Sequence, residues 1–338
     1  RKEDPDKYLY EYNGIVISTG SIELLAPKGE VLNTKDLVAT GDPTSEKFNA
    51  YVLIEADKDL ANYAYNILAD KDITLISHSG NIINSAVLQS TSGDITLNAE
   101  NGSVANTKEG WVDGTSRRNE NGGDIIALNG KVELLAGGSS QEKITVEGKE
   151  YKSGSVINNG DIVSLGETGL IHLRSEQGDV INTTDLRKIY NAKGEEIGNI
   201  YEALAGTNAG KGGAIDPNYD KAINGYLIST NDITLKAPEG AIYNSKELLV
   251  ALGNVTMEAA EGMDSFGDTI YAGKNINLTA NKGDLVNNAK LISLEGNINL
   301  TSKEGSVVNM LNADIEALGT GEDKGNVNLK AGGNTTYG

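Results

Sequence analysis

Short segments of the chain alternate apolar and polar residues in the way that half-buried β-strands do. In residues 298–302, for example, Ile298, Leu300 and Ser302 occupy alternate positions, whereas the residues between them are polar. Successive side chains of a strand point to opposite faces, so this alternation predicts strands with one buried face and one solvent-exposed face. The predicted fold then depends on how these segments are spaced.

The alternating segment belongs to a repeat with fixed spacing. Its template reads apolar, any, apolar, any, Ala or Ser, two of any type, Gly, three of any type, and then Asn. Eight copies have glycine seven residues after the start, and degenerate copies begin at Val132 and Val327. The eight start at Ile22, Ile73, Ile95, Ile171, Ile233, Val255, Ile276 and Ile298. From residue 233 onward the starts lie 22, 21 and 22 residues apart, a period typical of one β-solenoid coil.

An asparagine recurs eleven residues after the start in seven of the eight copies. These residues are Asn33, Asn84, Asn106, Asn182, Asn244, Asn287 and Asn309. Alternation resumes after the glycine, so the amides are expected to face inward, where an unpaired amide costs about 1–3 kcal/mol. Side chains stacked about 4.8 Å apart bond to one another and to the backbone instead. The pattern predicts an asparagine ladder, open where the copy from Val255 carries Phe266.

A third strand completes each coil. Three copies continue with leucine four residues after the asparagine and glycine nine residues after it, at Leu88 and Gly93, Leu248 and Gly253, and Leu291 and Gly296. The prediction is an all-β, single-stranded parallel β-helix of about 22 residues per coil. It runs as one continuous solenoid over residues 1–338 with loop insertions, and residues 40–70 are interpreted as one degenerate coil.

The charge, the cysteine content and the apolar runs of the chain limit the kinds of molecule that it can bind. Lys and Arg number 29 and Asp and Glu 48, and the net charge of −19 repels phosphate backbones and anionic lipids, which excludes nucleic acid as a partner. Absence of cysteine excludes disulfides and thiolate metal sites. No apolar run approaches the roughly 18 residues of a membrane span. The opening RKEDPDKYLY has no signal peptide, so we expect a monomeric internal fragment of a longer protein.

Three long intervals between starts indicate insertions beyond the coil. They place loop excursions at about 107–123, 137–155 and 184–224. Binding residues concentrate on loops held by a rigid scaffold, so these excursions are the candidate binding surface.

The candidate ligand-binding residues lie in the first and third excursions. The first contains Trp111, the only tryptophan, with Arg117 and Arg118, and the third contains Tyr190 and Tyr201. In one interpretation Trp111 stacks on a sugar ring while the arginines fix an acidic group. In the other, the aromatic residues pack their loops onto the shaft and the arginines pair with nearby carboxylates.

Residues 273–309, GKNINLTANKGDLVNNAKLISLEGNINLTSKEGSVVN, and 71–106 resemble repeats of filamentous haemagglutinin-like exoproteins that are exported by two-partner secretion. The resemblance implies a right-handed β-helix, display on a Gram-negative cell surface, and adhesion to a cell-surface receptor or glycan. It also implies passage through an outer-membrane transporter. We expect no catalysis and no cofactor. Residues 13–35 and 224–246 agree at twelve of 23 positions, and such modular growth gives the avidity that an adhesin uses.

Two other classes share this fold, polysaccharide-degrading enzymes and tailspike-like phage fibres. Such enzymes cluster carboxylates, Lys, Arg or Ca²⁺ ligands on an outer face, and no paired-carboxylate motif is present at a useful distance. His78, at a predicted turn, and His172, at an outward position, are interpreted as solvated residues that form no metal site. A trimeric fibre needs long exposed apolar seams, and the polar residue after each start argues against a seam on that face.

Overall fold

The computed structural model shows an all-β protein. It describes residues 14–41, 49–112, 115–118, 122–138, 143–146, 149–183, 188–190, 196–199, 225–310, 313–333 and 335–337. In these residues no helix is long and apolar enough to cross a membrane. The chain divides into two compact units, unit 1 (Arg1–Val156 and Gly160–His172) and unit 2 (Ile157–Asn159 and Leu173–Gly338).

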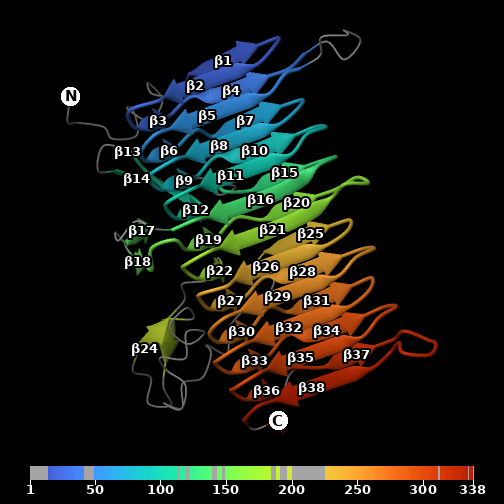
Figure 1. Ribbon diagram of the computed structural model, residues 1–338. Coiled ribbons are helices and arrows are strands. Elements are labelled where there is room, and N and C mark those ends of the chain that lie inside the picture. The colour runs from blue at the N-terminus through green and yellow to red at the C-terminus, as the bar shows by residue number, and fades with distance from the viewer. Residues whose placement is uncertain are drawn as a thin grey trace. The chain divides into compact units, whose positions relative to one another are not determined.

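Unit 1 is built from three parallel sheets, A, B and C, whose strands alternate along the chain (Figure 1). Sheet A contains β1 (Ile15–Ser18), β4 (Asp36–Ala39), β7 (Asn66–Ala69), β10 (Val87–Ser90), β15 (Ile125–Ala127) and β20 (Ile162–Ser164). Sheet B contains β2 (Ile22–Ala26), β5 (Val52–Ala56), β8 (Ile73–Ser77), β11 (Ile95–Ala99) and β16 (Lys131–Ala136). Sheet C contains β3 (Val31–Asn33), β6 (Leu60–Asn62), β9 (Ile82–Asn84) and β12 (Val104–Asn106).

Unit 2 repeats the same three-sheet arrangement. Sheet A contains β25 (Tyr226–Ser229), β28 (Glu247–Val250), β31 (Thr269–Ala272), β34 (Lys290–Ser293) and β37 (Ile315–Ala317). Sheet B contains β26 (Ile233–Ala237), β29 (Val255–Ala259), β32 (Ile276–Ala280), β35 (Ile298–Ser302) and β38 (Val327–Ala331). Sheet C contains β22 (Val180–Asn182), β27 (Ile242–Asn244), β30 (Met263–Ser265), β33 (Leu285–Asn287), β36 (Val307–Asn309) and β39 (Thr335–Tyr337). The strands β19 (Val156–Asn158) and β21 (Leu170–Ser175) contain residues of both units.

Register brings like residues into vertical contact inside each unit. Ile276 pairs with Ile298 and Leu278 with Leu300, and all four side chains are fully buried. Each core is therefore a stack of inward-facing Ile, Leu, Val and Ala, which bury apolar surface without large aromatic rings. The predicted parallel β-helix is confirmed in each unit.

Residues 49–70 form one coil, as the sequence predicts for the degenerate segment. Val52 lies between Ile22 and Ile73 in sheet B, so the coil occupies a regular place in the stack. Its ladder asparagine, Asn62, follows Val52 by ten residues instead of eleven, which is why the template does not detect it.

The repeated glycine marks the place where successive corners touch. A Cβ atom on Gly102 would lie 2.0 Å from the carbonyl oxygen of Gly80 in the preceding coil. At the corresponding corner of the first coil, a Cβ on Gly29 would meet nothing within 4 Å. The glycine is therefore required by close backbone approach between stacked coils.

Candidate functional site

An asparagine ladder lines one corner of unit 1. Asn33 donates from Nδ2 to Asn62 Oδ1 at 2.8 Å, Asn62 to Asn84 at 2.7 Å, and Asn84 to Asn106 at 2.9 Å. Asn84 also donates to the carbonyl oxygen of Ala86 at 3.0 Å. Asn33 and Asn84 thus bond both along the stack and to the bend of their own coil, which removes the cost of burial.

The ladder of unit 2 has two runs. Asn158 donates to Asn182 at 2.8 Å and Asn182 to Asn244 at 2.8 Å, and in the second run Asn287 donates to Asn309 at 2.8 Å. The two runs are separated by one coil that lacks an asparagine in sheet C.

Ser265 occupies the gap, so the prediction that Phe266 holds this place is wrong. Ser265 pairs with Asn244 on one side and with Asn287 on the other. The coil from Val255 has one residue fewer between sheets B and C, which moves the ladder position from eleven to ten residues after the start. Ser265 Oγ is buried and, among the described residues, has no hydrogen-bond partner.

Each of the three predicted excursions contains an antiparallel β-hairpin. The hairpins are β13 (Glu109–Val112) with β14 (Thr115–Arg118), β17 (Ile144–Val146) with β18 (Lys149–Tyr151), and β23 (Lys188–Tyr190) with β24 (Glu196–Asn199). The first and third begin shortly after a ladder asparagine, Asn106 and Asn182 respectively, and the second follows a strand of sheet B. The insertions therefore begin at the turns between strands of a coil, where extra residues do not interrupt the sheets.

The structure brings three of the candidate binding residues into one hairpin. In β13 and β14 the backbone of Trp111 pairs with Ser116, that of Gly110 with Arg117, and that of Glu109 with Arg118. Tyr190 lies in β23 opposite Glu196. Tyr201 lies outside the described residues, so its position stays a prediction.

The second hairpin has an apolar side and a polar side. Ile144, Val146 and Tyr151 are each exposed to only 3%. On the other side, the ammonium of Lys143 pairs with Glu150 at 2.8 Å in solvent. This hairpin is packed through its apolar residues and presents charged and polar groups outward.

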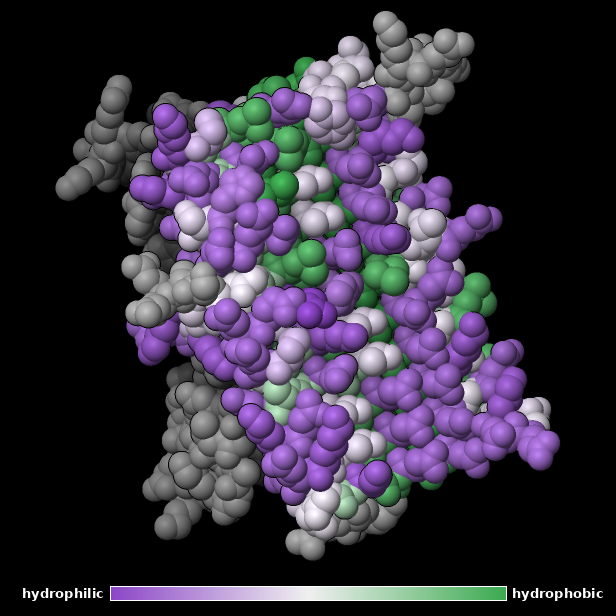
Figure 2. All heavy atoms as spheres, viewed as in Figure 1, coloured by the Kyte–Doolittle hydropathy of each residue, from purple (hydrophilic) through white to green (hydrophobic). Residues whose placement is uncertain are grey.

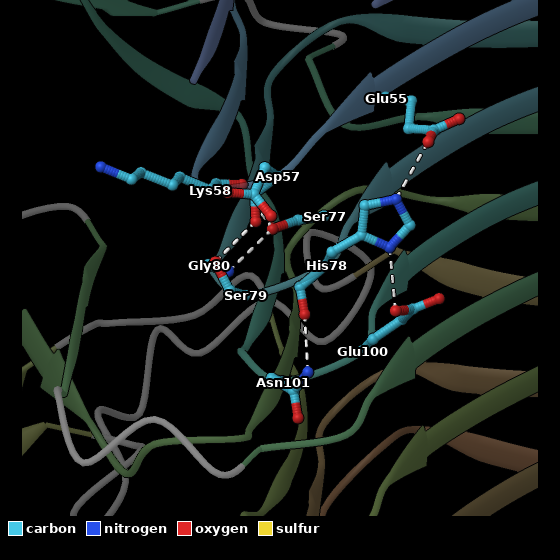
Figure 3. Close-up of polar contacts among 9 residues, drawn as sticks. All are labelled: Glu55, Asp57, Lys58, Ser77, His78, Ser79, Gly80, Glu100 and Asn101. Atoms are coloured by element: carbon cyan, nitrogen blue, oxygen red, sulfur yellow. Dashed lines mark hydrogen bonds and ion pairs between the residues drawn. The ribbon is translucent and has the colours of Figure 1, made fainter. Parts of the chain in front are cut away.

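On the outer surface of unit 1, His78 bridges two carboxylates from neighbouring coils (Figure 3). Its Nε2 lies 3.0 Å from Glu55 and its Nδ1 2.9 Å from Glu100, and hydrogen bonds to these two glutamates raise the pKa of His78 to about 9. His78 remains 39% exposed, and it also forms two ion pairs that the sequence did not indicate. At neutral pH the protonated ring links three successive coils and is not available as a general base.

One carboxyl group in unit 2 has an unusual protonation equilibrium. Burial, together with the charge of Asp284, raises the pKa of Asp264 in β30 to about 8. Asp264 therefore keeps its proton at pH 7 and can donate a hydrogen bond. No His, Cys, Asp or Glu cluster suited to a metal ion occurs in the part of the chain that the structure describes.

Sequence reasoning missed ladders at two other turns of the coil. At the corner between sheets B and C, Asp59 accepts from the backbone N–H of Asn81 at 2.7 Å. At the turn from sheet A into sheet B, Asp72 accepts from that of Asp94 at 2.8 Å. In unit 2 the same bond joins Asp232 to Asn254 at 2.7 Å. The signal was present, because Asp or Asn stands immediately before many repeat starts, where its carboxylate or amide caps the turn of the next coil.

Lys246 was also missed. Its side chain is fully buried in unit 2, and its ammonium donates to the carbonyl oxygen of Asn159 at 3.0 Å. The residue two positions after a ladder asparagine is alanine at 86 and 289 but lysine at 35, 108 and 246, so the sequence alone does not single out Lys246.

Comparison with protein-family models, characterised proteins and solved structures finds no match to this chain. The class of protein is therefore defined by the fold and by the insertions. It is a parallel β-helix whose coils carry inserted hairpins.

Proposed function

We propose that this chain is a shaft segment of a secreted, cell-surface filamentous adhesin, and that its inserted hairpins bind a receptor or glycan on another cell. The observation that carries the proposal is the contrast between a regular stack of coils and hairpins inserted at its corners. A rigid scaffold holds such loops in fixed conformations, which lowers the entropy lost on binding.

The first hairpin is the preferred binding element. Trp111, Arg117 and Arg118 are brought into one two-stranded unit of eight paired residues, in a chain whose net charge is −19. Tryptophan and arginine are the residue types enriched where binding energy concentrates. An acidic ligand, such as a sialylated or uronic-acid glycan, matches an arginine pair that is rare in this chain.

The fold also suits an export route through an outer-membrane transporter. A chain without cysteine forms no disulfide during passage, and each coil finds its stacking partner in the coil before it. We therefore propose export by two-partner secretion, which co-expression with a transporter of that type tests through appearance of the chain in the medium.

Binding of the purified chain to cells and to a glycan array tests the adhesin proposal. Trp111→Ala combined with Arg117→Ala and Arg118→Ala is expected to lower binding at least tenfold, because stacking and the charged hydrogen bonds are both removed. A matched control replaces Lys143, Thr145 and Glu150 in the second hairpin with alanine and is expected to bind like the wild type. Unchanged binding by the first variant would reject the hairpin as the site, and release of new reducing ends from a polysaccharide would support an enzyme instead.

A further inference from the structure

Sheet A carries apolar side chains on its outward face, at one register position in successive coils. In unit 1 the residues in register are Ile17, Val38, Leu68, Gln89, Ile126 and Val163. In unit 2 they are Ile228, Leu249, Tyr271, Ile292 and Glu316. We call these two rows the unit 1 seam and the unit 2 seam. Only Gln89 and Glu316 interrupt them with a polar side chain.

Exposed leucines widen each seam at the turn that follows sheet A. Leu128 and Leu165 in unit 1 are 42% and 36% exposed. In unit 2, Leu252, Leu294 and Leu318 are 62%, 43% and 52% exposed. Figure 2 shows hydrophobic residues exposed between hydrophilic ones on the visible face, most densely toward its upper end. Isolated apolar residues are normal on a surface, whereas contiguous rows mark interaction sites.

The chemistry of the seams excludes two kinds of partner. Sugar rings stack on aromatic faces, and Tyr271 is the only aromatic side chain in either row. Anionic membranes attract basic surfaces, whereas acidic residues flank the seams, among them Asp36, Asp124 and Glu247. The seams therefore match a protein surface that is itself apolar and has the spacing of stacked strands.

We propose that a second copy of this chain packs along the seams, with the outer faces of sheet A in contact. A second copy supplies the same apolar rows at the same spacing of about 4.8 Å. Acidic residues such as Asp36, Asp124 and Glu247 precede or begin the strands of sheet A, and the turn leucines follow them together with Asp70, Glu167 and Glu295. Shafts that run parallel about a two-fold axis place the more acidic flank against the leucine flank, which opposes fewer like charges than an antiparallel arrangement does.

The area of a seam determines how tightly the proposed dimer is expected to associate. Sheet A of unit 1 has six strands of three or four residues, which gives a strip of about 29 Å by 13 Å, or roughly 380 Å². A stable interface buries about 800 Å² on each partner. One seam supplies about half of that area, so we expect each seam to contribute to a weak dimer that depends on concentration.

This inference differs from the expectation of a monomeric fragment. The argument against a trimeric fibre concerned only the polar residue after each repeat start, which lies on the outer face of sheet B. The seams lie on sheet A, where the corresponding outward position is apolar. A lateral dimer is also independent of whether the inserted hairpins bind a receptor.

Sedimentation velocity of the full chain over a concentration series tests the proposal. The wild type is expected to form a dimer at high concentration, and the dimer is expected to strengthen with added salt, because salt screens the repulsion between chains of charge −19. Leu249→Thr, Tyr271→Thr and Ile292→Thr together are expected to weaken association at least tenfold, since threonine keeps strand propensity but removes apolar area. A second triple variant, Leu68→Thr, Ile126→Thr and Val163→Thr, tests the unit 1 seam in the same way.

The matched control carries the same kind of change on another face. Leu53, Ile76 and Leu135 point outward from sheet B of unit 1, and their replacement by threonine is expected to leave the dimer intact. Circular dichroism shows whether each variant keeps its β-structure. A wild type that stays monomeric at every concentration and salt level would overturn the proposal. So would a loss of association equal in the control and the seam variants, or association that weakens with salt.

Discussion

Replacement of Asn84 by leucine isolates the energetic role of the asparagine ladder. Asn84 is fully buried and takes part in three bonds of 3.0 Å or less, from Asn62, to Asn106 and to the carbonyl oxygen of Ala86. Leucine leaves the Asn62 amide, the Asn106 amide and the Ala86 carbonyl each without the bond to residue 84 while they stay buried. Each lost bond lowers the free energy of unfolding by about 1–3 kcal/mol. The larger apolar side chain recovers about 1.5–3 kcal/mol through burial. We expect a net loss of about 3 kcal/mol.

Asn98 provides the control, because it lies on the outer face of β11 in the next coil and is partly exposed. Asn98→Leu is expected to change stability by less than about 0.5 kcal/mol. Repeat proteins open locally, so hydrogen exchange at the backbone amides of residues 82–84 and 104–106 should be measured together with thermal unfolding. Equal effects of the two substitutions on both measurements would refute the stabilising role of the ladder.

Three further predictions follow from the contacts within the coils. Gly102→Ala should lower the free energy of unfolding by about 1–3 kcal/mol, because its Cβ would overlap the carbonyl of Gly80. Gly29→Ala should be nearly neutral, and equal melting temperatures of the two variants would contradict the corner contact. Ser265→Asn should raise stability by about 1 kcal/mol by joining the two ladder runs of unit 2, and a lower urea midpoint would show that this shorter coil has no room for the amide. Folding raises the pKa of His78 from 6.5 to about 9, so its ion pairs stabilise fully below pH 6.5 and cease to contribute as the pH rises through about 9. The difference in melting temperature between the wild type and His78→Gln should follow that window, and a difference independent of pH would contradict it.

The sequence predicts the stack well because every coil reuses the same few contacts. Inward alternation, the corner glycine and the ladder asparagine each recur at a fixed offset, and each has one physical cause. The sequence template did not detect Ser265 as a ladder position. The connection between sheets B and C is one residue shorter in this coil, and this change leaves the register of both sheets intact. A template with fixed spacing cannot follow such a change.

Features of the outer surface were harder to predict from the sequence. His78 and its partners Glu55 and Glu100 lie about 22 residues apart, and their contact depends on the side-chain geometry of a strand residue, Glu55, and of two turn residues, His78 and Glu100. The seams were missed because sheet A is represented in the template by only a leucine and a glycine. The alternation within sheet A, as in Tyr226, Leu227 and Ile228, includes apolar residues on both faces and so conceals which of them point outward.

The most direct test of the stacked coils is a series of distances between spin labels. Thr234, Thr256, Asn277 and Asn299 form one outward column in unit 2, and the chain has no native cysteine to interfere with labelling. Pairs between residue 234 and each of the others are predicted to separate by about 4.8 Å more with each coil, which reaches about 14 Å for residues 234 and 299. Distances that do not grow in equal steps along this column would contradict the parallel β-helix.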